Sequence, residues 1–370
     1  MAASAAARQP QPTDVLTFRL GEDIRTVAGK ILTRALDGSV LHLGRDGQIW
    51  PVKRRDLISL KRNAAPFRPM SADELAGRLR SEFGEDFEIY QTPHYLICYS
   101  TSLDYARWCG HLFEQLYRSF MQYWRNRGFA VQEPEFPLVA VVFDHRFNYI
   151  EYGREEAGAR ISRVVGFYSP QTNRIALYNP LAQTRRARLP RRMTRRQRNQ
   201  TFARVTGSLN VATIIHEATH QIAFNAGFHQ RYADNPLWLV EGMAIYFETP
   251  DLNSDTGWEH MGELNARRLD HFRRYSYRRP DDALVDLITD DERFRNPQTV
   301  QDAYAEAWAL NYFLIRARPD QYHAYLRILN DKPPMMDDTP AKRLEDFRST
   351  FGYDLKALDA DFVRYMKQFF

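Results

Sequence analysis

Residues 216–220 read His216-Glu217-Ala218-Thr219-His220, and this short stretch decides which fold the chain requires. In a helix, side chains four positions apart lie on one face, one turn above the other. Two imidazoles placed in this way can reach a single metal ion, with the glutamate beside the first of them free to act on water. We therefore expect His216 and His220 to bind a metal and Glu217 to serve as general base.

The residues around the motif predict a helix that is at least partly buried. Ser208 is a suitable N-cap, and Gly227 is a suitable residue to end the helix. An exposed helix with two surface histidines is the alternative, but neutral histidines beside a core need hydrogen-bond partners or a metal. Apolar side chains recur between the two ends at helical spacing: Ile214, Ile215, Ala218, Ile222 and Ala223.

A catalytic zinc needs a third protein ligand, and Glu241 is the candidate. It lies in an apolar segment, residues 235–248, which we expect to be a second helix capped by Asn235. Small residues at Gly242 and Ala244 would let this helix approach the first one closely. A carboxylate among apolar side chains is poorly explained as an exposed charge, because buried charges are usually paired or bound to metals.

These two segments, HEATHQIAFNAGF from His216 and PLWLVEGMAIYFE from Pro236, resemble the gluzincin metallopeptidases, the thermolysin- and aminopeptidase-like clan. The likeness is closest to a largely uncharacterised bacterial branch. It implies a zincin-like α+β domain over residues 85–370, with a small mixed sheet, an active-site helix and a helical lower half. It also implies one Zn²⁺ per chain and hydrolysis of peptide bonds by zinc-activated water, with Glu217 as general base.

The chain departs from the thermolysin pattern at one position. Thermolysin-type members carry an acidic residue four positions after the glutamate ligand, where it orients a ligand histidine, and this chain has Ile245 there. Support for the ligands must then come from elsewhere, and Asn225 and Glu248 are the candidates.

The reaction also needs a hydrogen-bond donor for the developing oxyanion. Tyr304 resembles the tyrosine that aminopeptidase-like members use for this purpose. Its alternative role is core packing, because Tyr304, Trp308 and Tyr312 follow one another at a spacing of four. Three other donors stay open: Tyr246, His260 and His271.

The sheet of this domain is expected from three stretches. Residues 136–143 read as a buried strand, and residues 166–178 read as a hairpin. In the clan, the edge strand before the active-site helix pairs with an extended substrate, so we place Asn173, Ile175 and Leu177 in substrate binding. Residues 102–127 are expected to form a long helix packed on the sheet.

An arginine-rich loop, residues 185–198, contains eight arginines. The whole chain carries a formal charge of +5, so this one loop accounts for its basicity. The loop is either a solvated segment or a contact site for an acidic partner. It has no interleaved aromatic side chains, so we expect no specific recognition of nucleic acid.

The first residues predict a separate small domain. Short strands separated by Gly and Asp-Gly turns over residues 13–62 favour an SH3-like β-barrel, expected to dock on the catalytic domain. Residues 63–84 would form a linker and a helix capped by Ser71 and Glu74.

Composition bears on where the protein is located and on the state of its cysteines. No stretch is apolar enough to span a membrane, and the Ala-rich start favours an extracytoplasmic protein, periplasmic or secreted, without excluding the cytoplasm. Cys98 and Cys109 are expected in a strand and a helix, as core residues.

The main hypothesis is a zinc peptidase acting on peptides or proteins, with internal cleavage favoured over aminopeptidase action. The alternative is a catalytically silent scaffold that binds a protein or anionic partner through the barrel and the arginine-rich loop.

Overall fold

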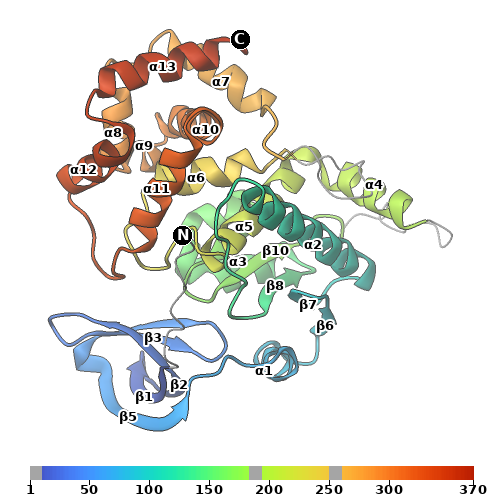
Figure 1. The fold of residues 1–370 in the computed structure, drawn as a ribbon. Coiled ribbons are helices and arrows are strands. Elements are labelled where there is room, and N and C mark those ends of the chain that lie inside the picture. Colours follow the sequence, from blue (N-terminus) through green and yellow to red (C-terminus); the bar gives the residue numbers. More distant parts are fainter. Residues whose placement is uncertain (1–10, 183–193, 250–260) are drawn as a thin grey trace.

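The computed structural model describes residues 11–182, 194–249 and 261–370 of the chain. Helices take up 50% and strands 19% of the residues, which confirms the α+β class. Figure 1 shows three parts in succession: a sheet of residues 12–66 at one end, a second sheet in the middle, and the C-terminal helices at the other end. None of the helices in the described ranges is both long and apolar enough to cross a membrane.

The N-terminal sheet is antiparallel and open. Its order is β4-β3-β2-β1-β5, so β4 and β5 are its two edges, and the expected closed barrel does not form in the described residues. The sequence did not predict β5, which pairs with β1 at one edge of the sheet. The strands are β1 (Pro12–Leu20), β2 (Asp23–Arg34), β3 (Val40–Gly44), β4 (Ile49–Val52) and β5 (Leu57–Pro66).

The helix that follows, α1 (Ala72–Phe83), begins as its sequence predicts. The Glu74 backbone N–H donates to Ser71 Oγ at 3.2 Å, and the Ser71 N–H donates to the Glu74 carboxylate at 2.8 Å. This reciprocal pair satisfies two donors at the start of the helix.

The second sheet is mixed, with order β6-β7-β8-β10-β9. Its three central strands are parallel, and each edge strand is antiparallel to its neighbour. The strands are β6 (Glu88–Gln91), β7 (Tyr95–Tyr99), β8 (Leu138–Phe143), β9 (Gly166–Ser169) and β10 (Arg174–Tyr178).

Both faces of this sheet are covered by helices. Along β8, the side chains of Leu138, Ala140 and Val142 enter one core, and those of the alternate residues enter another, as strand geometry requires. The first core lies under α2 (Leu103–Arg125) and α5 (Ser208–Asn225), and the second lies under α1 and α3 (Arg146–Ala157). The predicted long helix is thus α2. Both cysteines are buried and free, Cys98 in β7 and Cys109 in α2.

The C-terminal half is a set of helices around α10 (Val300–Ala317), which packs on α6, α7, α9, α11 and α13. The close approach expected at Gly242 of α6 is made to α10, because a Cβ there would lie 2.1 Å from Asn311 Nδ2 and 2.4 Å from the Ala307 carbonyl oxygen. The remaining helices are α4 (Arg195–Thr206), α6 (Leu237–Tyr246), α7 (Ala266–Ser276), α8 (Ala283–Thr289), α9 (Glu292–Arg295), α11 (Pro319–Asn330), α12 (Pro340–Phe351) and α13 (Leu355–Lys367).

Candidate metal centre

Three side chains from two helices meet at one point, as the sequence predicts. His216 and His220 come from the middle of α5, and Glu241 comes from α6. One ligand atom of each lies within 4.8 Å of the others. His216 Nε2 is 3.0 Å from His220 Nε2 and 3.1 Å from Glu241 Oε2. All three residues are largely withdrawn from solvent, so their charges are not screened by water.

The helix α5 holds its two histidines rigidly because its other face is core. Ile214, Ile215, Ala218 and Ile222 are fully buried against the sheet and α2. Gln221, also fully buried, donates from its side-chain amide to the backbone carbonyl of Val139 in β8 at 3.0 Å. This hydrogen bond fixes the second half of the helix to the sheet.

The start of α6 is fixed by a contact that local sequence does not reveal. The Leu237 N–H donates to Asp291 Oδ1 at 3.0 Å, although the two residues are far apart in the chain. The expected cap, Asn235, instead donates to the backbone carbonyls of Gln230 and Ala233 in the preceding loop. Asp291 therefore caps α6 in place of Asn235. It fixes the start of the helix that carries Glu241.

Glu248 supports the first ligand. His216 Nδ1 lies 2.8 Å from Glu248 Oε1, and the second oxygen of Glu248 accepts from Asn265 Nδ2 at 3.4 Å. A carboxylate accepts hydrogen bonds, so Nδ1 carries a proton toward Glu248 and Nε2 is the nitrogen left to face a metal. Glu248 thus takes the position beside His216 that the acidic residue of the thermolysin pattern would take, whereas Ile245 is fully buried.

The donor atoms fit a divalent cation. His216 Nε2 faces a carboxylate oxygen of Glu241 and the second imidazole, and atoms with lone pairs that converge in this way repel one another unless a proton or a metal cation lies among them. Two imidazoles and one carboxylate are a ligand set typical of catalytic zinc.

Burial and the mutual contacts of His216, His220 and Glu241 also shift the pKa of each of these residues. Burial lowers the pKa of His216, but its hydrogen bonds to Glu241 and Glu248 outweigh this and raise the pKa well above its usual value, so a metal that binds at Nε2 would displace a proton from this ring. Burial by itself would raise the pKa of Glu241, whereas His216 and His220 lower it to about 2. Burial and the neighbouring His216 lower the pKa of His220 to about 4. Glu241 is therefore ionised and His220 neutral near pH 7, the forms that bind a metal.

Glu217 lies beside the ligands and is held by the sheet. Its Oε2 accepts from the backbone N–H of Tyr168 in the edge strand β9 at 2.8 Å. Burial, opposed by His216, raises the pKa of Glu217 to about 7. A carboxylate with its pKa near neutrality can both accept and return a proton.

Tyr304, on α10, also reaches the centre. The negative charge of Glu241 together with burial raises the pKa of Tyr304. The hydroxyl therefore keeps its proton and can donate it in a hydrogen bond. Tyr304 lines the cleft, whereas Trp308 and Tyr312 of the same stripe are buried in the core.

The other candidate donors lie elsewhere. Tyr246 is fully buried, and its hydroxyl is 2.6 Å from that of Tyr123. His271 Nε2 is 2.8 Å from Asp302 Oδ1. His260 lies outside the described residues.

The residues expected to bind substrate do not line the cleft. Because β10 lies between β8 and β9, its Ile175 and Leu177 are fully buried core residues. Asn173 and Asn225 exchange side-chain hydrogen bonds at 2.8 and 2.9 Å, so Asn225 supports the hairpin and not a ligand histidine. The edge strand of this hairpin is β9 and not β10. The prediction therefore chose the wrong one of its two strands.

A cleft of about 480 Å³ opens over the three ligand atoms. Apart from the ligands, Glu217 and Tyr304, it is lined by aromatic and apolar side chains and one asparagine. These residues are Tyr168, Pro170, Phe224, Tyr232, Ala233, Asn235, Leu237 and Val240.

Comparison with known proteins finds one family model, DUF1570, described as a protein of unknown function, which matches residues 210–336. The matched stretch contains the three converging ligands, Glu217, Glu248 and Tyr304. No curated protein matches the chain.

Proposed function

We propose that the protein is a zinc-dependent peptidase of the gluzincin type, with a zincin-like domain over residues 85–370. The convergence of His216, His220 and Glu241 within 4.8 Å carries this proposal. These three side chains would hold the ion. When bound, zinc supplies a Lewis acid that lowers the pKa of water and polarises a carbonyl group.

The protein's own groups then move the protons. Glu217, held by the Tyr168 N–H, accepts a proton from the attacking water and passes it to the leaving amine. The protonated hydroxyl of Tyr304 donates a hydrogen bond to the carbonyl oxygen as negative charge develops on it. Because both groups face a cleft lined by apolar side chains, the charges act in a medium of lowered dielectric constant.

The cleft favours internal cleavage over aminopeptidase action. Glu217 and Glu241 are the acidic residues among those that line it, and both have roles in the reaction. The described lining therefore offers no further carboxylate to hold a free amino terminus. A map of products from a denatured protein mixture tests this point, because internal cuts and end-trimming give different fragments.

The test of the proposal pairs metal analysis with Glu217→Gln. We expect about one zinc per chain in the wild type and in the variant, with hydrolysis of a denatured protein substrate lost at least about a hundredfold in the variant. Glu292→Gln, which changes an exposed glutamate on α9, serves as the matched control and should behave as wild type. A wild-type protein that holds zinc and cleaves no peptide in broad libraries would overturn the peptidase and favour the silent scaffold.

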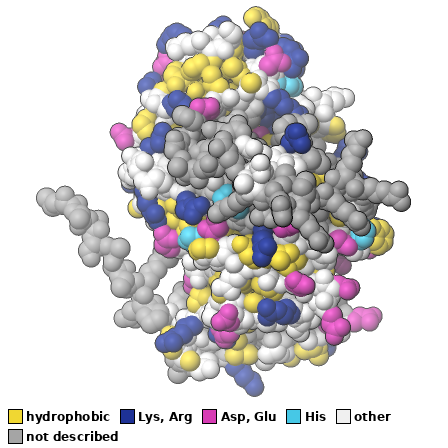
Figure 2. All heavy atoms as spheres, turned by 90° about the vertical axis from the view of Figure 1, so that its right-hand side faces the viewer, with side chains coloured by type: hydrophobic (Ala, Val, Ile, Leu, Met, Phe, Trp, Pro, Cys, Tyr) yellow, Lys and Arg dark blue, Asp and Glu magenta, His cyan; other side chains and the backbone are white. Residues whose placement is uncertain are grey.

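The scaffold alternative requires a surface that binds an anionic or protein partner. Residues 185–193 of the arginine-rich loop lie outside the described residues. On the face drawn in Figure 2, the described Lys and Arg side chains are scattered among Asp and Glu and do not gather into one basic patch. The described surface on this face therefore adds no support for an anionic partner.

A further inference from the structure

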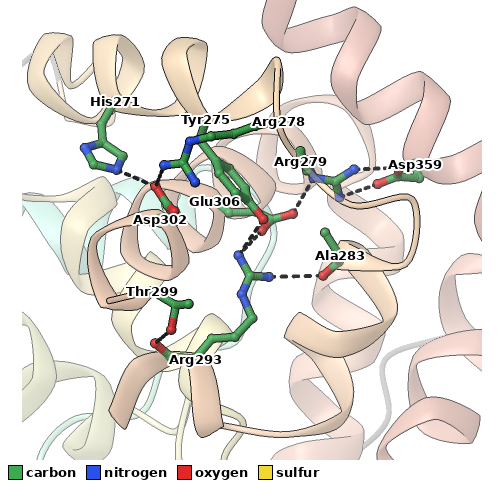
Figure 3. A network of polar contacts seen from close by, with 10 residues as sticks. All are labelled: His271, Tyr275, Arg278, Arg279, Ala283, Arg293, Thr299, Asp302, Glu306 and Asp359. Carbon is green, nitrogen blue, oxygen red and sulfur yellow. Dashed lines mark hydrogen bonds and ion pairs between the residues drawn. The ribbon is translucent and has the colours of Figure 1, made fainter. Parts of the chain in front are cut away.

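A network of charged side chains lies behind the proposed catalytic tyrosine. It joins α7, the loop after it, α9, α10 and α13, and Figure 3 shows its side chains converging on two carboxylates of α10, Asp302 and Glu306. Both carboxylates are buried. They lie four positions apart and so on one face of α10, whereas Tyr304, two positions from each, projects from the opposite face, toward the cleft.

Asp302 fastens α7 to α10. Its Oδ1 lies 2.8 Å from His271 Nε2, in the middle of α7, and accepts from Arg278 Nη2 at 2.7 Å, just beyond the end of that helix. The two contacts hold α7 along its second half (Figure 3).

Glu306 fastens α9 in the same way. Its side chain is fully buried and accepts from Arg293 of α9 at 2.7 Å and from Arg279 at 2.6 Å. Arg293 also donates to the Tyr275 hydroxyl at 2.9 Å and to the Ala283 carbonyl at 3.2 Å. A fully buried carboxylate between two guanidinium groups admits little movement of either partner.

Both of these helices, α7 and α9, contact the ring of Tyr304. The Arg268 guanidinium of α7 lies 5.4 Å from the ring centroid. The Phe294 ring of α9 packs edge-on at 5.4 Å between centroids. The position of the tyrosine thus depends on both helices keeping their places on α10.

We propose that Asp302 and Glu306 are positioning residues, which hold the Tyr304 hydroxyl against the metal centre by fixing α7 and α9 on either side of its ring. The inference rests on the proposed function, because it assigns the network to the oxyanion donor of that reaction. Misplacement of a catalytic group by about 1 Å can lower a rate by about a hundredfold, so such fixing has a measurable consequence.

Asp302→Asn is the informative variant. The partners of Asp302 are 29% and 63% exposed, so water can solvate them after the change, whereas Glu306→Gln would remove a charge partner from Arg293 and Arg279, which are only 16% and 6% exposed. We expect Asp302→Asn to lower kcat about tenfold, with KM and zinc content unchanged.

A double-mutant cycle separates positioning from a general structural role. Tyr304→Phe alone should lower kcat about a hundredfold. In that background Asp302→Asn should change kcat by less than about twofold, because the hydroxyl that it positions is gone. An equal loss from Asp302→Asn in both backgrounds would overturn the proposal.

Asp346→Asn is the matched control. Asp346 is a buried carboxylate on α12 with two lysine partners, Lys332 and Lys342, and it touches none of the contacts around Tyr304 named above. It should lower thermal stability as much as Asp302→Asn does while leaving kcat unchanged.

A spectroscopic measurement tests the positioning without any turnover. With 3-fluorotyrosine at position 304, the ¹⁹F resonance should shift or broaden in Asp302→Asn and stay unchanged in Asp346→Asn. An unaltered resonance in Asp302→Asn contradicts the proposal even in a protein that cleaves peptides. Absence of turnover in the wild type, with the expected ¹⁹F changes, would instead remove the proposed function and leave the positioning by Asp302 standing.

Discussion

Single residues decide the chemistry of the centre, and Glu248 shows how. The sequence offers Asn225 and Glu248 equally as supports for a ligand. The structure separates them, because the Glu248 carboxylate lies 2.8 Å from His216 Nδ1 whereas the amide of Asn225 hydrogen-bonds to Asn173 and to the Gln221 carbonyl. The difference is the direction in which each side chain leaves its backbone, and that direction depends on tertiary packing.

Glu248→Ala should therefore weaken zinc binding about 10–100-fold, since it removes the acceptor that fixes the tautomer and orientation of His216. Asn225→Ala is the paired comparison and should leave the zinc affinity within about threefold of wild type. Competition with a chromogenic chelator measures both. Equal losses in the two variants would mean that Glu248 has no particular role at the ligand.

At the scale of elements, the predictions that hold are those carried by local patterns. The apolar run of β8, the capping box of α1 and the apolar stripes of α2 and α5 are all recorded within a few residues of sequence, and each element lies close to where it was expected, although Gly207 and not Ser208 is the N-cap of α5. The errors concern neighbours. Residues of β10 were expected at the free edge, but strand order is set by which segments pair, and a hairpin alone does not say which of its strands is outermost.

The packing of α6 on α10 gives an element-scale prediction. A Cβ at Gly242 would lie 2.1 Å from Asn311 Nδ2 and 2.4 Å from the Ala307 carbonyl oxygen, distances that require the helices to separate. Gly242→Ala should therefore lower the free energy of unfolding by about 1–3 kcal/mol. It should also weaken zinc binding, because Glu241 is the neighbouring residue.

The control for this substitution is Gly77→Ala, in the exposed middle of α1, where an added Cβ meets no atom within 4 Å. Alanine favours helix over glycine by about 1 kcal/mol, so this change should stabilise the protein slightly. Urea unfolding compares the two variants. A Gly242→Ala protein as stable as wild type would show that α6 and α10 can part without cost.

At the scale of the whole molecule, the N-terminal sheet is joined to the cleft. The Ile49 N–H of β4 donates to the Gln171 carbonyl at the tip of the β9–β10 hairpin, at 2.7 Å. Tyr232, which lines the cleft, packs on the core of the N-terminal sheet. The sequence predicted that this domain docks on the catalytic domain, but contacts between segments more than a hundred residues apart leave no local pattern, so their place could not be foreseen.

Arg231 is the centre of this junction and carries the prediction at this scale. Its guanidinium donates to the backbone carbonyls of Gly47, in the N-terminal sheet, at 2.8 Å and of Pro170, at the cleft, at 3.2 Å. Arg231→Met should release the hairpin from the sheet and speed amide hydrogen exchange in residues 166–173 about tenfold or more, because local opening then costs less free energy. Lys30→Met breaks the Lys30–Glu135 ion pair of 2.7 Å, which also joins the N-terminal sheet to the rest of the chain but does not contact the hairpin, and should leave that exchange unchanged. Equal exchange in the two variants would mean that Arg231 holds the domains together without holding the cleft.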